Sequence, residues 1–133
     1  MQKKEFQEKI LIYQILESRL NSLLKQKEIL SQKLLEISQT LQTLNEINEN
    51  ETFFSLGSGI FSKGKITDPN KFLVFIGSNT SIEMEKSEAI SFLERRKEEI
   101  EKALNEIAKE ESKLIEQLNQ ISKEISKFSQ NVQ

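Results

Sequence analysis

The sequence predicts an α+β protein: a long antiparallel coiled-coil helical hairpin with a central insert of two β-hairpins. Two observations lead to this fold class. Residues 1–50 and 86–133 contain no Gly or Pro and repeat their apolar residues at three- and four-residue spacings. Residues 51–85 contain all four Gly, the only Pro and five of the eight Phe. We therefore expect a single domain, residues 1–133, divided at these boundaries into helix, strand region and helix.

The first helix is expected over about residues 6–49, because its apolar residues follow a heptad repeat. In such a repeat the first and fourth positions, a and d, form the stripe that a partner helix covers. The pattern continues over about six heptads, which indicates a coiled coil rather than a helix on a globular surface. The a positions are Phe6, Tyr13, Leu20, Lys27, Leu34, Leu41 and Asn48, and the d positions are Lys9, Leu16, Leu23, Leu30, Ile37 and Leu44.

The second helix is expected over about residues 87–129 and repeats the pattern. Ser87 is a candidate helix cap, and Glu88 places a carboxylate near the positive end of the helix dipole. Two helices of matched length around a short insert should fold back on each other as antiparallel neighbours. The a positions are Ile90, Lys97, Leu104, Glu111, Leu118, Ile125 and Val132, and the d positions are Leu93, Ile100, Ile107, Leu114, Ile121 and Phe128.

Two charged residues interrupt the apolar stripes about half-way along each helix, Lys27 in the first and Glu111 in the second. An antiparallel arrangement can bring them within one helical turn of each other. A polar pair at such a place costs stability but specifies the register of the two helices. The alternative is that Lys27 extends into solvent without a partner.

The insert contains four candidate strands and one obvious turn. Asp68-Pro69-Asn70 combines a side chain that accepts a backbone hydrogen bond, a fixed φ and a residue tolerant of turn conformations. We expect this turn to join the strands on its two sides as a hairpin, flanked by two weaker strands. The candidate strands are residues 52–56, 59–66, 72–76 and 80–84.

The strand at residues 72–76, Phe-Leu-Val-Phe-Ile, is apolar on both of its faces. Four short strands are too few to close a barrel within one chain. A small sheet with two apolar faces and two free edges normally requires a partner sheet. The insert is therefore predicted to be an oligomerisation surface from which the helices project.

The composition excludes most catalytic chemistry. The chain of 133 residues has a net charge of −2 and contains neither Cys nor His. Disulfides and thiolate metal sites are therefore excluded, and the commonest general base and metal ligand are missing. We expect no enzyme activity, no catalytic residues, no metal and no cofactor.

One motif resembles a phosphate-binding loop but is incomplete. Residues 59–65 fit its first seven positions, whereas the eighth, which must be Ser or Thr to hold Mg²⁺, is Ile66. A turn and a strand are also expected where the motif needs a helix.

The sequence shows no signal for secretion, membrane insertion or nucleic-acid binding. The first residues are too charged for a signal peptide, and no apolar run approaches the length of a membrane span. Charge is spread evenly, without a basic arm. We expect a cytoplasmic protein.

Apolar residues gather at the ends of both helices that lie far from the insert. Ile10, Leu11 and Ile12 are consecutive, so a single helix seam cannot bury all three. Two interpretations stay open. The tips either present an apolar surface to another chain, or close on each other and leave Leu11 exposed. The tip residues are Phe6, Ile10, Leu11, Ile12, Ile121, Ile125, Phe128 and Val132.

A more specific pattern runs through residues 55–95. Ser-Leu-Gly-Ser-Gly-Ile-Phe at 55–61, Phe-Leu-Val-Phe-Ile-Gly at 72–77 and Glu-Ala-Ile-Ser-Phe-Leu-Glu-Arg at 88–95 occur in the order typical of one family. On these residues the chain resembles the alpha-type subunit of prefoldin. Four candidate strands favour the alpha type, because the beta-type subunit has one hairpin instead of two.

The resemblance implies an ATP-independent molecular chaperone. In this family two alpha-type and four beta-type subunits form a hetero-hexamer, in which the hairpins assemble into an oligomeric β-barrel. The coiled-coil tips hold unfolded client proteins and deliver them to a group II chaperonin. The eight tip residues would then contact clients. The implied oligomer interface is Leu56, Ile60, Phe61, Ile66, Phe72, Val74, Ile76 and Ile82.

A second interpretation belongs to a different functional class. A gamma-type, filament-forming relative of prefoldin has the same layout, and it assembles with itself rather than with beta-type subunits. On that interpretation the chain is a structural protein, a filament or a tether.

Overall fold

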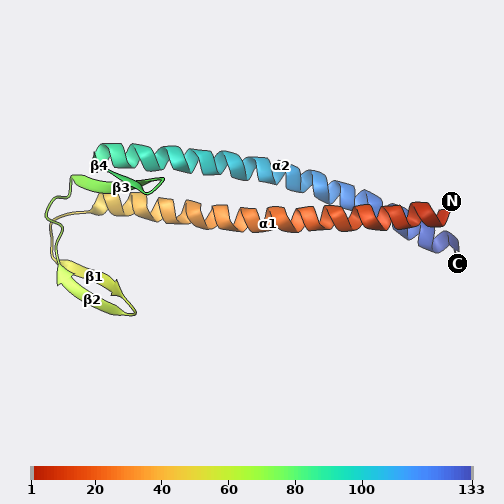
Figure 1. The fold of residues 1–133 in the computed structure, drawn as a ribbon, viewed down its shortest axis with the longest axis horizontal. Coiled ribbons are helices and arrows are strands. Elements are labelled where there is room, and N and C mark those ends of the chain that lie inside the picture. Colours follow the sequence, from red (N-terminus) through yellow and green to blue (C-terminus); the bar gives the residue numbers. More distant parts are fainter. Residues whose placement is uncertain (1, 133) are drawn as a thin grey trace. The chain divides into compact units, whose positions relative to one another are not determined.

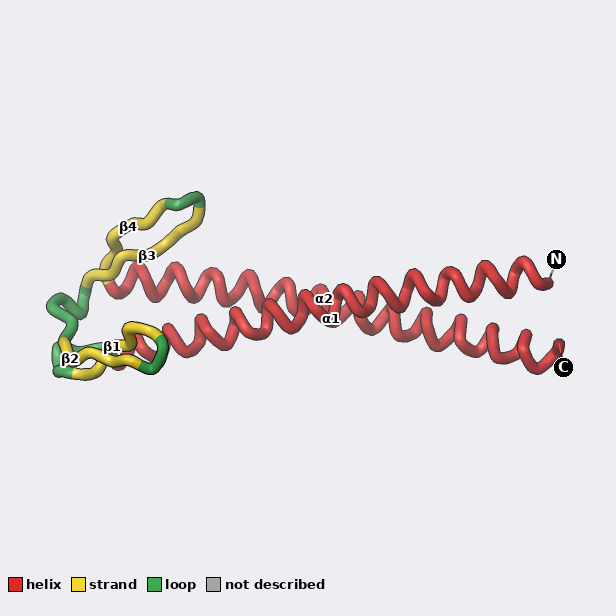
Figure 2. The backbone as a smooth tube through the Cα atoms, turned by 60° about the horizontal axis from the view of Figure 1, so that its bottom comes forward, coloured by secondary structure: helices red, strands yellow, loops and turns green. Residues whose placement is uncertain are grey.

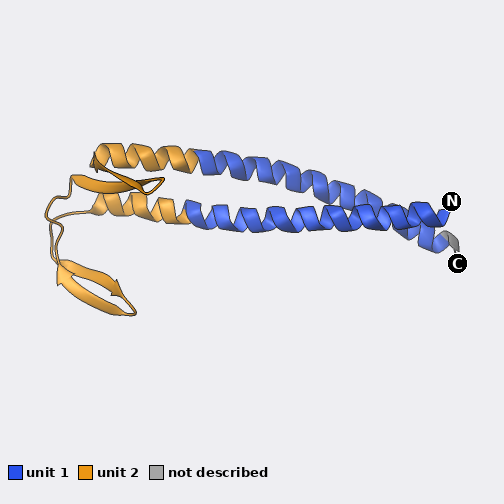
Figure 3. Ribbon diagram, viewed as in Figure 1, with its two compact units in different colours: residues 1–34, 99–133 blue, residues 35–98 orange. Residues whose placement is uncertain are grey.

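A computed structural model describes residues 2–132 of the chain, and their side chains as far as residue 130. Along the chain, one long helix precedes two pairs of strands and a second long helix follows them (Figure 1), as predicted. The residues form two compact units (Figure 3): unit 1 comprises residues 1–34 and 99–133, and unit 2 comprises residues 35–98. The elements are α1 (Gln2–Glu46), β1 (Thr52–Gly57), β2 (Ile60–Gly64), β3 (Lys71–Gly77), β4 (Thr80–Glu85) and α2 (Lys86–Val132).

Unit 1 consists of the outer parts of both helices, paired along the predicted seam. Phe6 contacts Phe128, and Arg19 contacts Glu110, so the two segments run antiparallel. The centre of the seam is a cluster of Leu23, Ile107 and Leu114. All three occupy predicted d positions. The half-buried residues packed against this cluster, Leu16, Leu20 and Leu30, are also seam residues.

Of the two alternatives left open for the charged seam residues, the structure shows the pairing. Lys27 Nζ lies 3.4 Å from Glu111 Oε2, with the lysine half exposed and the glutamate better covered. The lysine therefore reaches its partner across the edge of the seam. Two more ion pairs join the segments, Arg19 with Glu110 and Lys9 with Glu124. In all three pairs α1 supplies the cation and α2 the carboxylate.

Unit 2 contains the strands, and their pairing corrects one prediction. β1 pairs with β2, and β3 pairs with β4, as two separate antiparallel sheets (Figure 2). The hairpin predicted across Asp68-Pro69-Asn70 is wrong, because this segment connects the two hairpins. It does turn the chain as expected, since Asp68 Oδ1 accepts the N–H of Asn70 at 2.9 Å.

Turn conformation explains the actual pairing. The loops are Ser58-Gly59, with φ of 53° and 78°, and Ser78-Asn79, with φ of 50° and 56°. Positive φ at both central residues is the signature of a type I′ turn, whose twist matches that of two paired strands. Proline cannot adopt positive φ, so a two-residue turn of this kind is unavailable at Pro69.

The two hairpins have the same design, displaced by 20 residues along the chain. Phe54 pairs with Ser62 in the first, and Val74 pairs with Ile82 in the second. Each register shifts by one residue just before its turn, at Gly57 and Gly77, and these glycines have φ of 102° and 105°. The positive φ explains why both bulges need glycine.

Helix α2 begins directly where β4 ends. It starts at Lys86, one residue before the predicted cap, so Ser87 lies inside the first turn with Glu88. The Lys86 N–H donates to the carbonyl oxygen of Asn70 at 2.8 Å. This hydrogen bond connects the start of the helix to the segment between the hairpins.

Candidate functional site

The two hairpins carry four of the eight predicted interface residues in exposed positions. Ile66, Phe72, Val74 and Ile76 are half-buried within unit 2. Four others are exposed to solvent, namely Leu56, Ile60, Phe61 and Ile82.

Three apolar residues outside the predicted interface are among the most exposed. Leu73 is 75% exposed, Phe53 66% and Phe75 59%. Because successive side chains of a strand point to opposite faces, Leu73 and Phe75 lie on the face opposite Phe72 and Val74. An all-apolar strand does not indicate which of its faces is covered.

The polarity of the cross-strand neighbours separates the two faces of β3. Val74 pairs with Ile82, whereas Leu73 pairs with Glu83. One face of the hairpin is thus apolar on both strands, and the other combines Leu73 and Phe75 with polar residues of β4. This signal is present in the sequence, but it can be read only once the β3–β4 pairing is known.

The first hairpin is exposed along almost its whole length. Every residue from 51 to 63 is exposed, including two phenylalanines on β1 and one on β2. A two-stranded hairpin is marginally stable on its own in water. Contiguous exposed apolar side chains on such a hairpin are typical of a protein–protein interface.

The helix tips, in contrast, are closed in this structure. The rings of Phe6 and Phe128 stack, with centroids 4.5 Å apart and an angle of 19° between their planes. Ile10, Ile121 and Ile125 are half-buried, whereas Leu11 and Ile12 are exposed. The side chain of Val132 lies outside the described residues.

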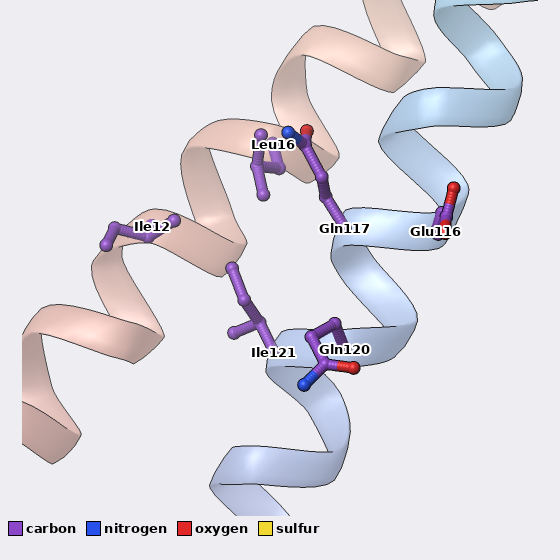
Figure 4. Close-up of a pocket in the computed structure, with 6 residues that line it drawn as sticks. All are labelled: Ile12, Leu16, Glu116, Gln117, Gln120 and Ile121. Atoms are coloured by element: carbon purple, nitrogen blue, oxygen red, sulfur yellow. The ribbon is translucent and has the colours of Figure 1, made fainter.

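A groove of about 440 Å³ opens between the helices near the tip. Ile121 extends from α2 toward Ile12 and Leu16 of α1, and polar residues of α2 form the rim (Figure 4). The apolar floor and the amide side chains can accept an apolar side chain of another molecule, but they provide no reactive group. The rim residues are Glu116, Gln117 and Gln120.

The described part of the chain offers no metal centre and no membrane segment. Among residues 2–132, no three His, Cys, Asp or Glu side chains converge as metal ligands would. Within the same range, neither helix has an apolar stretch long enough to span a bilayer. The phosphate-loop resemblance also has no structural support, since Gly59 lies in a turn and residues 60–64 form β2.

The ion pair nearest the tip changes the acidity of one carboxyl group. Lys9 Nζ lies 3.1 Å from Glu124 Oε2, and Gln120 Nε2 lies 3.5 Å from the other oxygen. The hydrogen bond from Lys9 lowers the pKa of Glu124 below its ordinary value of 4.5, with further contributions from Gln120 and the charge of Lys127. The carboxylate therefore stabilises the closed tip above about pH 4.5, and this contribution is lost as the pH falls through the lowered pKa.

We expect replacement of Lys9 by Met to raise the pKa of Glu124 toward 4.5, since Met keeps the apolar stem but removes the charge. Titration of the Glu124 carboxyl carbon by NMR measures both values. Lys25→Met is the matched control, because Lys25 is exposed and forms no ion pair among the described residues. An unchanged Glu124 pKa in Lys9→Met would contradict the assignment.

Comparison with known proteins identifies the family. The family model described as prefoldin subunit matches residues 16–131. The chain belongs to the prefoldin family. A prefoldin alpha subunit of Pyrococcus horikoshii is 35% identical over 106 residues, which cover 76% of this chain and 72% of that protein. The alpha subunit of Archaeoglobus fulgidus is 36% identical over 103 residues, covering 74% of this chain and 75% of that protein.

A solved structure supports the same fold. Filamentous PFD from Methanocaldococcus jannaschii superposes with a TM-score of 0.70 at 19% identity, covering 89% of this chain and 98% of that one. Prefoldin is a family of non-enzymatic chaperone subunits, and its members form complexes with beta-type subunits. The predicted resemblance to an alpha-type prefoldin is confirmed by both curated relatives.

Proposed function

We propose that this chain is an ATP-independent chaperone subunit that binds non-native proteins at its helix tips and delivers them to a group II chaperonin. The observation that carries the proposal is the distribution of its exposed apolar residues within a family of chaperone subunits. Eight of these residues lie on the hairpins, and Leu11 and Ile12 lie at the tip, two surfaces suited to different partners. Neither surface has a group for covalent chemistry, and contact between apolar surfaces requires none.

The hairpins are the proposed assembly surface. We infer that they pair with hairpins of beta-type subunits in a complex of two alpha-type and four beta-type chains, closing a β-barrel that no single chain can form. The implied contacts are Leu56, Ile60, Phe61, Ile66, Phe72, Val74, Ile76 and Ile82. The exposure of Phe53, Leu73 and Phe75 adds these three residues to that surface.

The tips are the proposed client surface. Leu11 and Ile12 are accessible in the closed tip, beside the groove. A single apolar contact of this kind is weak, but several tips held in one assembly bind the same client with a high effective concentration. Release then needs no nucleotide, because folding of the client removes its exposed apolar residues. The remaining client contacts would be Phe6, Ile10, Ile121, Ile125, Phe128 and Val132.

Removing the tips tests whether assembly and client binding use separate surfaces. We expect a chain lacking residues 1–12 and 121–133 to assemble with beta-type subunits as the full chain does, because the hairpins are untouched. It should fail to suppress aggregation of a denatured protein, measured by light scattering, whereas the full complex suppresses it. Full suppression by the truncated complex would show that clients bind elsewhere.

Self-assembly into a structural filament is the second candidate function. One chain presents two hairpins with equivalent registers, so copies could join head to tail in an arrangement that does not close. The filamentous PFD similar in fold makes this arrangement worth testing. Light scattering of the chain alone and mixed with a beta-type subunit separates the two: long rods from the chain alone favour the filament, and a discrete hetero-hexamer favours the chaperone.

A further inference from the structure

We propose that the helix tip is held shut by a latch, formed by the Phe6–Phe128 stack and the Lys9–Glu124 ion pair, which must open before a client can contact the half-buried tip residues. This inference rests on the proposed function and concerns its regulation. The two rings stack at 4.5 Å, and the ion pair measures 3.1 Å. Both contacts join α1 to α2 within unit 1.

The latch occupies the surface that a client would need. Of the seven tip residues whose side chains are described, five are half-buried in the closed tip. Phe6 and Phe128, the two largest of them, cover each other. Only Leu11 and Ile12 remain exposed within this group. In the closed tip, the apolar groups that would contact a client therefore pack against each other.

The tip is also less well packed than the centre of the seam in unit 1. Residues 2–15 and 119–130 contain no buried side chain, whereas the interior of the seam buries Leu23, Ile107 and Leu114. The side chains of the latch ion pair are each 38% exposed, so water and salt screen their attraction. Helical segments with only partial burial open more readily than a packed interior. The tip can thus open while the interior seam stays paired.

Reversal of one latch charge tests the opening without any client. We expect Lys9→Glu to place two carboxylates opposite each other and to speed amide hydrogen exchange in residues 2–15 and 119–130 about tenfold. Exchange around Leu23 should stay unchanged. Adding Glu124→Lys restores an ion pair and should return the tip to slow exchange.

The matched control is Lys25→Glu, which makes the same change in charge at an exposed position of α1 outside the seam. Equal exchange at the tip in Lys9→Glu and Lys25→Glu would overturn the latch. The latch would also be overturned if amide hydrogen exchange stayed fast in the variant that combines Lys9→Glu with Glu124→Lys.

A tether tests the consequence for clients. The chain contains no Cys, so in Lys9→Cys/Glu124→Cys the two introduced thiols are the only ones. Joining them with a bismaleimide holds the tip closed, whereas N-ethylmaleimide modifies the same atoms and leaves it free. We expect the tethered chain to capture denatured, reduced lysozyme at least about tenfold more weakly than the capped chain, a difference of about 1.4 kcal/mol.

The outcomes separate the latch from the proposed function. Equal capture by the tethered and the capped chains would overturn the latch and leave the chaperone function standing. Absence of capture by the capped and the unmodified chains alike, each assembled with beta-type subunits, would overturn the chaperone function. The hydrogen-exchange comparison then decides on its own whether the tip opens as proposed.

Discussion

Replacing Leu23 by Ala is expected to reduce the free energy of unfolding by about 2–5 kcal/mol, the range observed for large-to-small changes in packed cores. Leu23 is 1% exposed and clusters with Ile107 and Leu114, so the deletion leaves a cavity in the centre of the helix seam. Urea unfolding followed by circular dichroism measures the loss. The protein concentration must be held constant, because assembly shifts the apparent stability.

The neighbouring residue provides the control for this change. Leu24 is 40% exposed, so Leu24→Ala removes the same atoms from a site in contact with water. We expect a loss below about 1 kcal/mol, since exposed substitutions have small effects and Ala favours a helix. Equal losses at the two positions would show that the seam is not packed as described.

Replacing both Leu73 and Phe75 by Lys is expected to abolish assembly with a beta-type subunit while the helices remain folded. Both side chains are exposed on the same face of β3. If they are central to the interface, each contributes about 2 kcal/mol, and their joint loss weakens association roughly a thousandfold. Lys suits an exposed strand, opposes edge-to-edge pairing, and at position 73 faces Glu83, so the hairpin itself should persist.

Light scattering coupled to size exclusion measures this effect on the mixture of subunits. The control is Ile29→Lys, which removes an apolar side chain of similar exposure from α1 in unit 1, whereas the hairpins belong to unit 2. We expect Ile29→Lys to assemble normally. Normal assembly of the doubly substituted chain would instead assign the interface to the other face of β3, which contains Phe72 and Val74.

The helical part of the fold was predictable because its information is local and repeated. Apolar residues at heptad spacing predict the seam, and Leu23, Ile107 and Leu114 occupy its centre as expected. The antiparallel arrangement followed from the similar lengths of the helices. It allowed Lys27 to meet Glu111 without requiring it, and the structure shows this contact between residues 84 positions apart.

The strand region was less predictable because two turn signals compete within a few residues. Asp68-Pro69-Asn70 is rich in turn residues, yet the hairpins close at Ser58-Gly59 and Ser78-Asn79, where both residues adopt positive φ. A type I′ turn needs positive φ, which Ser and Asn adopt less readily than Gly. The residue types at these positions are therefore a weak signal for the turn. The four strands were found, but their partners were not.

Local sequence patterns were sufficient for the helices, the seam and the existence of an apolar strand insert, since each depends on residues close together in the chain. Three features could be read only from the folded structure: the pairing of the strands, the exposure of Leu73 and Phe75, and the closure of Phe6 on Phe128. An apolar side chain has the same chemistry whether a neighbour covers it or not. Only the folded arrangement decides which apolar residues remain available to a partner.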